Sequence, residues 1–327
     1  MIKKFFLSSF ALILLATAAV TIWRARPITS PIAAPIDFAI TPGSSVRSSI
    51  AQVVAAGVPV QPVLLELLAR ADGHAMRMKA GQYRLKPGTT PAQLLDQLVR
   101  GELAQEALII IEGSSFAEMR RAVAAHAALK HETVQWSDAE LLEKIAPELK
   151  VGEGMFFPDT YRFATNASDL QIYRQAYATM QKKLAQHWQQ RASDLPYATP
   201  YEALIMASII EKETGQKSER RQIAGVFVNR LRRGMMLQTD PTVIYGMGQQ
   251  YQGNIRRKDL QTDTPYNTYL RAGLPPTPIA LPGEQSLEAA MNPEKHTALY
   301  FVSRGDGTSH FSDNLNDHNR AVNKYQR

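Results

Sequence analysis

An apolar segment in the second half of the 327-residue chain constrains the fold more than any other. Thr199, Pro200 and Glu202 have the spacing of a helix N-terminus with a capping box. Gly215 is expected to supply a left-handed stop. Between these ends, Ser208 is the one polar side chain before the last turn. We therefore predict a helix that is buried on most sides, inside a domain large enough to cover it.

The last turn of this predicted helix carries two acids, Glu211 and Glu213. Burial raises the pKa of a carboxyl group, and the negative end of the helix dipole acts in the same direction. A glutamic acid that stays protonated near neutral pH can donate a proton to a leaving oxygen. The two side chains lie about 200° apart around a helix, so they cannot share one site. The pattern does not choose between them, and it also fits the solvated end of a core helix.

Residues 207–214, Ala-Ser-Ile-Ile-Glu-Lys-Glu-Thr, resemble the signature of the endolytic murein transglycosylases, the MltG or YceG-like family. The most specific block is residues 237–246, Leu-Gln-Thr-Asp-Pro-Thr-Val-Ile-Tyr-Gly. Further similar blocks, in the family order, are residues 153–161, 228–231, 266–269, 273–276, 310–312 and 318–319. One departure is Met155-Phe156-Phe157, where tryptophans are expected. The resemblance covers the chain from about residue 150 to its end.

The resemblance implies a reaction that needs one carboxyl group and no metal or cofactor. The acid protonates the oxygen that leaves C1 of N-acetylmuramic acid, and it then accepts the proton of that sugar's C6 hydroxyl, which closes a 1,6-anhydro ring. The resemblance also implies that the cut lies within glycan strands and not at their ends. A glycoside hydrolase normally needs two carboxyl groups. By position, the family's catalytic glutamate corresponds to Glu211. The family-like blocks also suggest substrate-binding residues: Asn229, Gln238, Asp240, Tyr245, Tyr266 and Asn267.

The first third of the chain contains a repeat that indicates a separate small domain. Residues 38–45, 83–90 and 108–115 each read as a short strand, a glycine turn and a hydroxyl-capped helix start. Such units resemble a LysM-like subdomain. We expect an α+β protein, with a membrane anchor at 1–26, a linker at 27–36, a LysM-like subdomain at 37–105 and a catalytic domain at 106–327.

The stretch from Phe5 to Ile22 carries no charge and reaches the lower end of the length that spans a bilayer. We expect a membrane helix ending near Trp23, although a signal peptide cleaved after Ala18 also fits the pattern. The family resemblance implies a single-pass protein of the bacterial inner membrane with its catalytic domain in the periplasm. It also implies peptidoglycan glycan strands as substrate and peptidoglycan synthases as partners.

Composition restricts the remaining function classes. Of the net charge of +7, the first 26 residues supply +4, so a nucleic-acid-binding face is not expected. The chain has no cysteine. A metal hydrolase using His310, Asp313, Asp317 and His318 is an alternative, but this spacing matches no closed zinc pattern. A membrane-tethered, noncatalytic glycan-binding scaffold is the other alternative, and release of anhydromuramyl ends from sacculi separates it from an enzyme.

Overall fold

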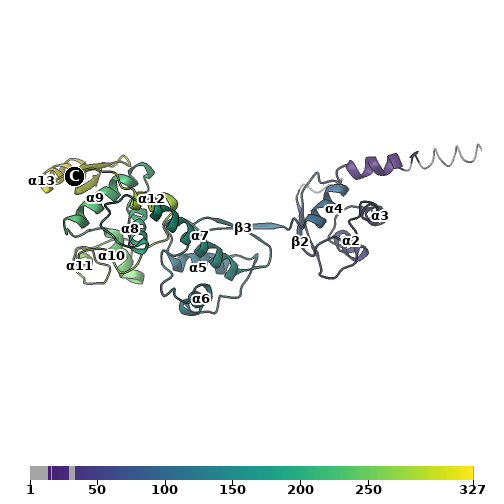
Figure 1. Ribbon diagram of the computed structural model, residues 1–327, viewed down its shortest axis with the longest axis horizontal. Helices are drawn as coiled ribbons and strands as arrows, with labels where there is room; N and C mark the ends of the chain where they lie inside the picture. The colour runs from purple at the N-terminus through teal and green to yellow at the C-terminus, as the bar shows by residue number, and fades with distance from the viewer. Residues whose placement is uncertain (1–13, 16, 29–33, 327) are drawn as a thin grey trace, which may run out of the picture. The chain divides into compact units, whose positions relative to one another are not determined.

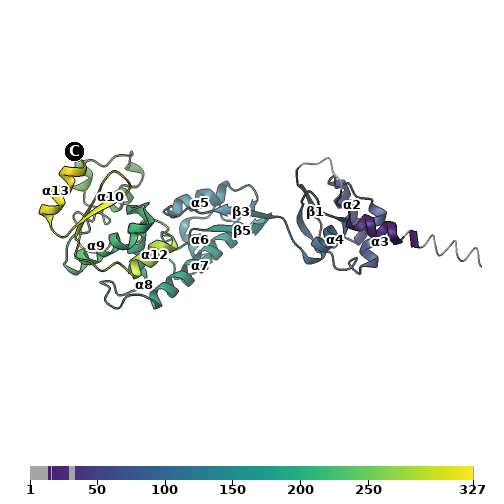
Figure 2. The same cartoon turned by 90° about the horizontal axis from the view of Figure 1, so that it is seen from above.

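The computed structural model describes residues 14–15, 17–28 and 34–326, which form two compact units (Figures 1 and 2). Unit 1 comprises Met1–Glu106 with Arg162–Asn166, and unit 2 comprises Ala107–Tyr161 with Ala167–Arg327. The division falls within a strand pair, β3 (Gln105–Ile109) and β5 (Thr160–Ala164), so the chain crosses between the units more than once. The mixed α+β class predicted from the sequence is confirmed, with helices and four two-stranded sheets among the described residues.

Unit 1 is built on one antiparallel strand pair. Its elements are β1 (Ile36–Ile40), α2 (Val46–Ala55), α3 (Pro62–Ala71), β2 (Gly81–Leu85) and α4 (Pro91–Arg100). Phe38 of β1 lies opposite Tyr83 of β2, and their rings stack 5.5 Å apart in the buried core of this unit. Trp23 packs against the same core, and Arg24 pairs with Asp72 at 3.1 Å.

The described residues contain no helix with the length and apolar character of a membrane span. The predicted span from Phe5 to Ile22 lies largely outside the described residues.

An aromatic cluster joins two helices in the first part of unit 2. The elements of this part after β3 are α5 (Phe116–Ala125), β4 (Leu129–Lys130), α6 (Asp138–Ile145), β6 (Ala167–Ser168) and α7 (Asp169–Gln189), with β4 and β6 paired in parallel. The ring of Phe156 stacks on Phe116 of α5 at 5.0 Å and meets Tyr173 of α7 edge-on at 6.0 Å. These rings join the segment before β5 to two of the helices.

Helix α8 (Pro200–Glu213) is the centre of the second part of unit 2. Its residues 203–210 are all buried, and it packs against α7, α9, α10 and α12. The hydroxyl of Ser208 donates to the carbonyl of Ile205 and accepts the N–H of Ile279 at 3.0 Å, so the one polar group of this stretch is satisfied. Thr199 and Glu202 form the predicted capping box.

The rest of unit 2 wraps around α8. The elements are η1 (Lys217–Glu219), α9 (Arg220–Arg232), α10 (Asp240–Met247), η2 (Gly248–Gln250), α11 (Arg257–Leu260), α12 (Glu284–Met291), β7 (Tyr300–Ser303), β8 (Ser309–Ser312) and α13 (Leu315–Tyr325). Strands β7 and β8 form an antiparallel hairpin on which α13 packs. Gly225 of α9 has to lack a side chain, because a Cβ there would lie 2.4 Å from the carbonyl oxygen of Glu294.

Several local predictions are confirmed and others are wrong. Ser45, Thr90 and Ser115 cap α2, α4 and α5 as the repeat predicted. The helix around residue 210 does not end in a left-handed glycine, because its C-cap is Thr214 in extended geometry and Gly215 is not among the residues with positive φ. Helix α10, which begins at Asp240 with a proline at the next position, was not predicted from the sequence. Helix α3 was not predicted from the sequence.

Candidate active site

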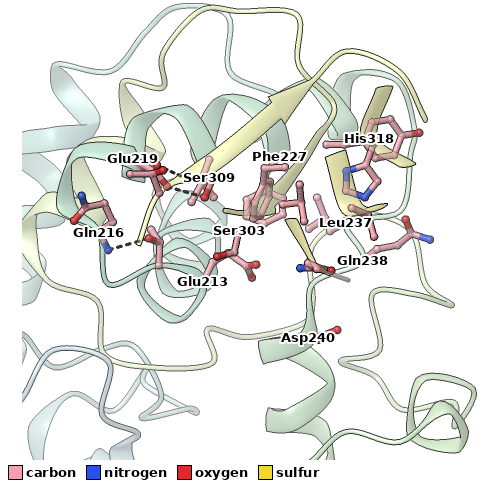
Figure 3. A pocket seen from close by; sticks show the side chains of 18 of the residues that line it. Glu213, Gln216, Glu219, Phe227, Leu237, Gln238, Asp240, Ser303, Ser309 and His318 are labelled. Carbon is pink, nitrogen blue, oxygen red and sulfur yellow. Dashed lines mark hydrogen bonds between the residues drawn. The ribbon is translucent and has the colours of Figure 1, made fainter. Parts of the chain in front are cut away.

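The end of α8 opens into a cavity of about 970 Å³ (Figure 3). Its wall is made by the last turn of α8, by η1 and α9, by the segment that precedes α10, and by the β7–β8 hairpin with α13. The polar residues that line it include Glu213, Glu219, Arg230, Gln238, Asp240, Tyr269, Tyr300, Ser309, His318 and Asn319. The volume is in the range of small-molecule sites in proteins.

Glu213 is the last residue of α8 and lies in this wall. Its side chain is only partly exposed, and its Oε2 atom accepts a hydrogen bond of 2.6 Å from the hydroxyl of Thr239. Burial raises the pKa of the Glu213 carboxyl, the hydrogen bond from Thr239 lowers it, and the neighbouring charge of Asp240 raises it again. The charge of Arg230 lowers it. The cavity therefore contains a carboxyl group whose pKa lies above the ordinary glutamate value, which is the direction that a general acid requires.

The loop before α10 supplies the wall next to Glu213. Gln238 has a left-handed backbone with φ of 50°, which is uncommon for a residue other than glycine. Its N–H donates to the carbonyl of Thr268 at 3.1 Å, which holds the strained turn in place. Asp240, the first residue of α10, accepts a hydrogen bond of 2.5 Å from the Tyr269 hydroxyl. Gln238 and Asp240, both predicted to bind substrate, thus lie in the same cavity as Glu213 (Figure 3).

A buried arginine fixes the frame of this wall. Arg230 of α9 donates to the carbonyl oxygens of Leu299 at 2.7 Å and Leu237 at 2.8 Å. Its guanidinium also lies 5.1 Å from the ring centre of Tyr300. Because these contacts join α9, the start of the hairpin and the segment before Gln238, Arg230 serves mainly to hold the backbone.

The C-terminal elements provide the opposite side of the cavity. His318 of α13 stacks on Tyr300 of β7 with ring centres 5.1 Å apart. Burial lowers the pKa of His318, and the charges of Arg230 and His310 lower it further, which favours the neutral imidazole. Glu219 accepts hydrogen bonds of 2.7 Å from both the N–H and the hydroxyl of Ser309, which joins η1 to β8 (Figure 3).

Glu211 lies on another side of α8, away from the residues of this cavity. Its carboxylate pairs with Arg220 at 2.9 Å, and the side chains of Glu211 and Arg220 are 4% and 6% exposed. The other carboxylate oxygen accepts the N–H of Gly283 at 2.9 Å. Glu211 therefore does not stand in the apolar surroundings expected from the sequence. It joins the end of α8 to α9 and to the residue before α12.

Two other predicted substrate-binding residues bind backbone instead of facing the cavity. The amide of Asn229 donates to the carbonyls of His296 at 2.8 Å and Ala298 at 3.1 Å. Asn267 is fully buried, and its amide donates to the carbonyls of Leu260 and Thr262. These contacts hold the chain before the hairpin and the loop after α11.

Tyr245 and Tyr266 belong to a second polar cluster, around Glu153. Their rings meet edge-on 4.8 Å apart, and the Tyr245 hydroxyl donates to Glu153 at 3.2 Å. The other Glu153 oxygen accepts the N–H of Phe116, the first residue of α5, at 3.0 Å. Burial raises the pKa of Glu153 to about 7, against hydrogen bonds that lower it. Since Glu153 is 6% exposed, this cluster joins α5 to α10 and is not an open site.

Among the described residues, no three histidine or acidic side chains are arranged to hold a metal ion. The four residues of the metal-hydrolase alternative have other partners. His318 stacks on Tyr300, His310 lies against Tyr325, Asp313 accepts a hydrogen bond from Thr297, and Asp317 pairs with Arg320.

Comparison with known proteins assigns a family to this fold and site. The sequence profile of the YceG-like family matches residues 38–324. The chain belongs to the YceG-like family. A YceG-like protein from Listeria monocytogenes has a crystal structure that matches with a TM-score of 0.55 at 30% identity, over 88% of this chain and 98% of that one.

Two curated relatives carry the name endolytic murein transglycosylase. The protein from Bacillus subtilis is 32% identical over an alignment of 268 residues, which covers 77% of this chain and 74% of that protein. The protein from Streptococcus pneumoniae strain D39 is 30% identical over an alignment of 317 residues, which covers 86% of this chain but only 57% of that protein. This YceG-like chain thus spans little more than half of the longer streptococcal relative.

The sequence did not single out several residues of the cavity, namely Glu219, Arg230, Tyr300 and Ser309. Glu213 was recognised only as the second acid of the motif. The one signal in the sequence was the angle between the two glutamates, which required that they face different surroundings.

The Glu153 cluster predicts a pH dependence of stability. A glutamate in the unfolded chain loses its proton near the ordinary pKa of 4.5, whereas Glu153 in the folded protein does so at about 7. Protonated Glu153 therefore contributes its full stabilisation below pH 4.5, and this contribution is lost as the pH rises to about 7. The free energy of unfolding should fall by about 3 kcal/mol over this range. Glu153→Gln should remove this loss when urea unfolding is compared at pH 5 and pH 8.

Exposed Glu143 offers a matched control, because Glu143→Gln should keep the wild-type change between the two pH values. If Glu153→Gln and wild type lose the same stability over this interval, Glu153 does not carry the effect.

Proposed function

We propose that this YceG-like protein is an endolytic murein transglycosylase and that Glu213 is its proton donor. The single observation that carries the proposal is the position of the Glu213 carboxyl. It lines the cavity at the end of α8, and burial raises its pKa. The names of the relatives support the reaction class and the peptidoglycan substrate.

In the proposed reaction, a glycan strand lies in the cavity with the bond between N-acetylmuramic acid and N-acetylglucosamine next to Glu213. Protonated Glu213 transfers its proton to the glycosidic oxygen as the bond to C1 breaks. The resulting carboxylate then accepts the proton of the C6 hydroxyl, whose oxygen bonds to C1 and closes the 1,6-anhydro ring. Glu213 ends the cycle protonated, as it began, so one carboxyl group suffices and no water is consumed.

Asp240 has a different role in this proposal. Its negative charge lies in the cavity and acts on Glu213, and the Tyr269 hydroxyl holds it in place. An anion there stabilises the positive charge that develops on the sugar ring in the transition state. Two carboxyl groups in one cavity also fit hydrolysis, with Asp240 as the base for water. Hydrolysis is therefore the second candidate, and the products distinguish the two.

The N-terminal part of the proposal rests on the sequence. The uncharged stretch from Phe5 to Ile22 supports a single-pass inner-membrane anchor, with units 1 and 2 in the periplasm. The element order β1, α2, α3, β2 with antiparallel strands supports a LysM-like assignment for residues 37–105, which superposition on solved LysM domains tests.

Replacing the proposed acid should abolish most activity. Glu213→Gln keeps the size of the side chain and removes the transferable proton, so turnover should fall by about 10²- to 10⁴-fold without loss of folding. Glu211→Gln is the matched variant in the same turn of α8. It should lower stability, because Arg220 loses the nearer of its two charged partners, Glu211 and Glu112, while turnover per folded molecule changes only a few-fold.

Sacculus digestion followed by mass spectrometry measures both variants. Anhydromuramyl ends without oxygen from labelled water support the proposal, whereas labelled reducing ends would show hydrolysis. Binding to sacculi without any cleavage would make the protein a scaffold. A fully active Glu213→Gln variant beside an inactive, folded Glu211→Gln variant would assign the proton to Glu211.

The anchor predicts that the mature protein keeps its N-terminus. Intact-mass measurement of protein extracted from membranes should give the mass of the uncleaved chain. A mass that begins at Ala19 would replace the anchor with a signal peptide.

A further inference from the structure

Three buried threonines form a hydrogen-bonded group behind Glu213. Thr239, Thr242 and Thr268 are each at most 2% exposed. They lie in the turn before α10, in α10 itself and in the loop that follows α11.

The hydrogen bonds of this group fix the direction of each hydroxyl. The Thr268 hydroxyl accepts the N–H of Thr239 at 3.1 Å and lies 2.8 Å from the Thr242 hydroxyl. Thr242 donates its own hydrogen to the carbonyl of Thr239 at 2.7 Å, so Thr268 must donate to Thr242. The backbone N–H and carbonyl of Thr239 are therefore both hydrogen-bonded within this group, and its hydroxyl donates to Glu213.

The same loop holds the residue before Thr239. The carbonyl of Thr268 accepts the N–H of Gln238, whose backbone is left-handed with φ of 50°. Residues held in such a conformation occur where the surrounding structure over-determines them, often at functional sites. Thr268 therefore fixes two successive residues, and the Thr239 side chain has little freedom to leave Glu213.

We propose that Thr239 is a positioning residue that keeps the transferable proton of Glu213 on Oε1. The Thr239 hydroxyl donates to Oε2 at 2.6 Å, so the proton of the neutral carboxyl resides on the other oxygen. After that proton has left, the same hydroxyl stabilises the carboxylate until the C6 hydroxyl returns a proton. Thr242 and Thr268 act through Thr239 by fixing its backbone. This inference rests on the proposed role of Glu213.

The decisive variant is Thr239→Val, which has nearly the same shape but no hydroxyl. Without a donor to the charged form, the pKa of Glu213 rises, because a hydrogen bond to a carboxylate favours that form. Activity needs protonated Glu213 and is lost as the pH rises through this pKa. In a plot of kcat against pH, the alkaline limb should therefore move to higher pH by about one unit. The maximal kcat should also fall about tenfold, because the acid loses its orientation.

The Thr239→Val substitution neither adds nor removes a titratable group. The other titratable groups lining the cavity are Glu219, Arg230, Asp240, Tyr269, Tyr300 and His318. Thr264→Val is the matched control, because the Thr264 hydroxyl is buried in the loop that also carries Thr268 and has no hydrogen-bond partner in the described part of the chain. It should leave the profile unchanged. Thr239→Ser restores the hydroxyl and should restore the limb to its wild-type position.

The outcomes separate this inference from the proposed function. An inactive Glu213→Gln variant together with a wild-type pH profile in Thr239→Val overturns the positioning role and leaves the acid in place. An active Glu213→Gln variant overturns the proposed function itself. If Thr239→Val does not fold, Thr239→Ala takes its place, and an unmoved alkaline limb in that variant also contradicts the inference.

Discussion

The burial of α8 on nearly all of its surface is the constraint on which the rest of unit 2 depends. A helix with eight successive buried residues, 203–210, has to be covered by other elements on every side, and α7, α9, α10 and α12 do this. Its last turn reaches the cavity that Glu213 lines. The charged side chains of that turn lose their hydration when the protein folds. Each therefore needs an oppositely charged or hydrogen-bonding partner, or it has to remain protonated and neutral.

The two glutamates of that turn meet this requirement in opposite ways. Glu211 has Arg220 and the N–H of Gly283 as partners, so it is compensated by charge and hydrogen bonding. Glu213 has the Thr239 hydroxyl, and its carboxyl remains close to a second acid, Asp240. One helix end thus carries a structural ion pair and a carboxyl that favours its proton. Separation by about 200° around the helix keeps the arginine from neutralising the acid.

The sequence predicted correctly those features that depend on residues close together in the chain, such as helix caps. The Thr199 capping box and the hydroxyl caps of the three repeat helices depend on residues a few positions apart. The choice between Glu211 and Glu213 depends on residues far along the chain. Gly283 is 72 positions from Glu211, and the cavity beside Glu213 is completed by β7, β8 and α13.

The asparagines of the motif blocks illustrate the same limit. Asn229 and Asn267 were expected near the substrate because their blocks resemble those of the family. In the structure their amides bind backbone carbonyls, which hold the chain that shapes the cavity. A block of family-like sequence therefore predicts the region of a site more reliably than it predicts which of its side chains face the ligand.

The most direct test of this account is the titration of the Glu213 carboxyl in the folded protein. Carbon-13 NMR of protein labelled at the glutamate carboxyl carbons would follow it, with the signal assigned by its loss in Glu213→Gln. The account predicts a midpoint above the ordinary glutamate range, because burial raises the pKa of this group. A midpoint at or below that range would mean that Glu213 is ionised at working pH, and it would contradict its assignment as the proton donor.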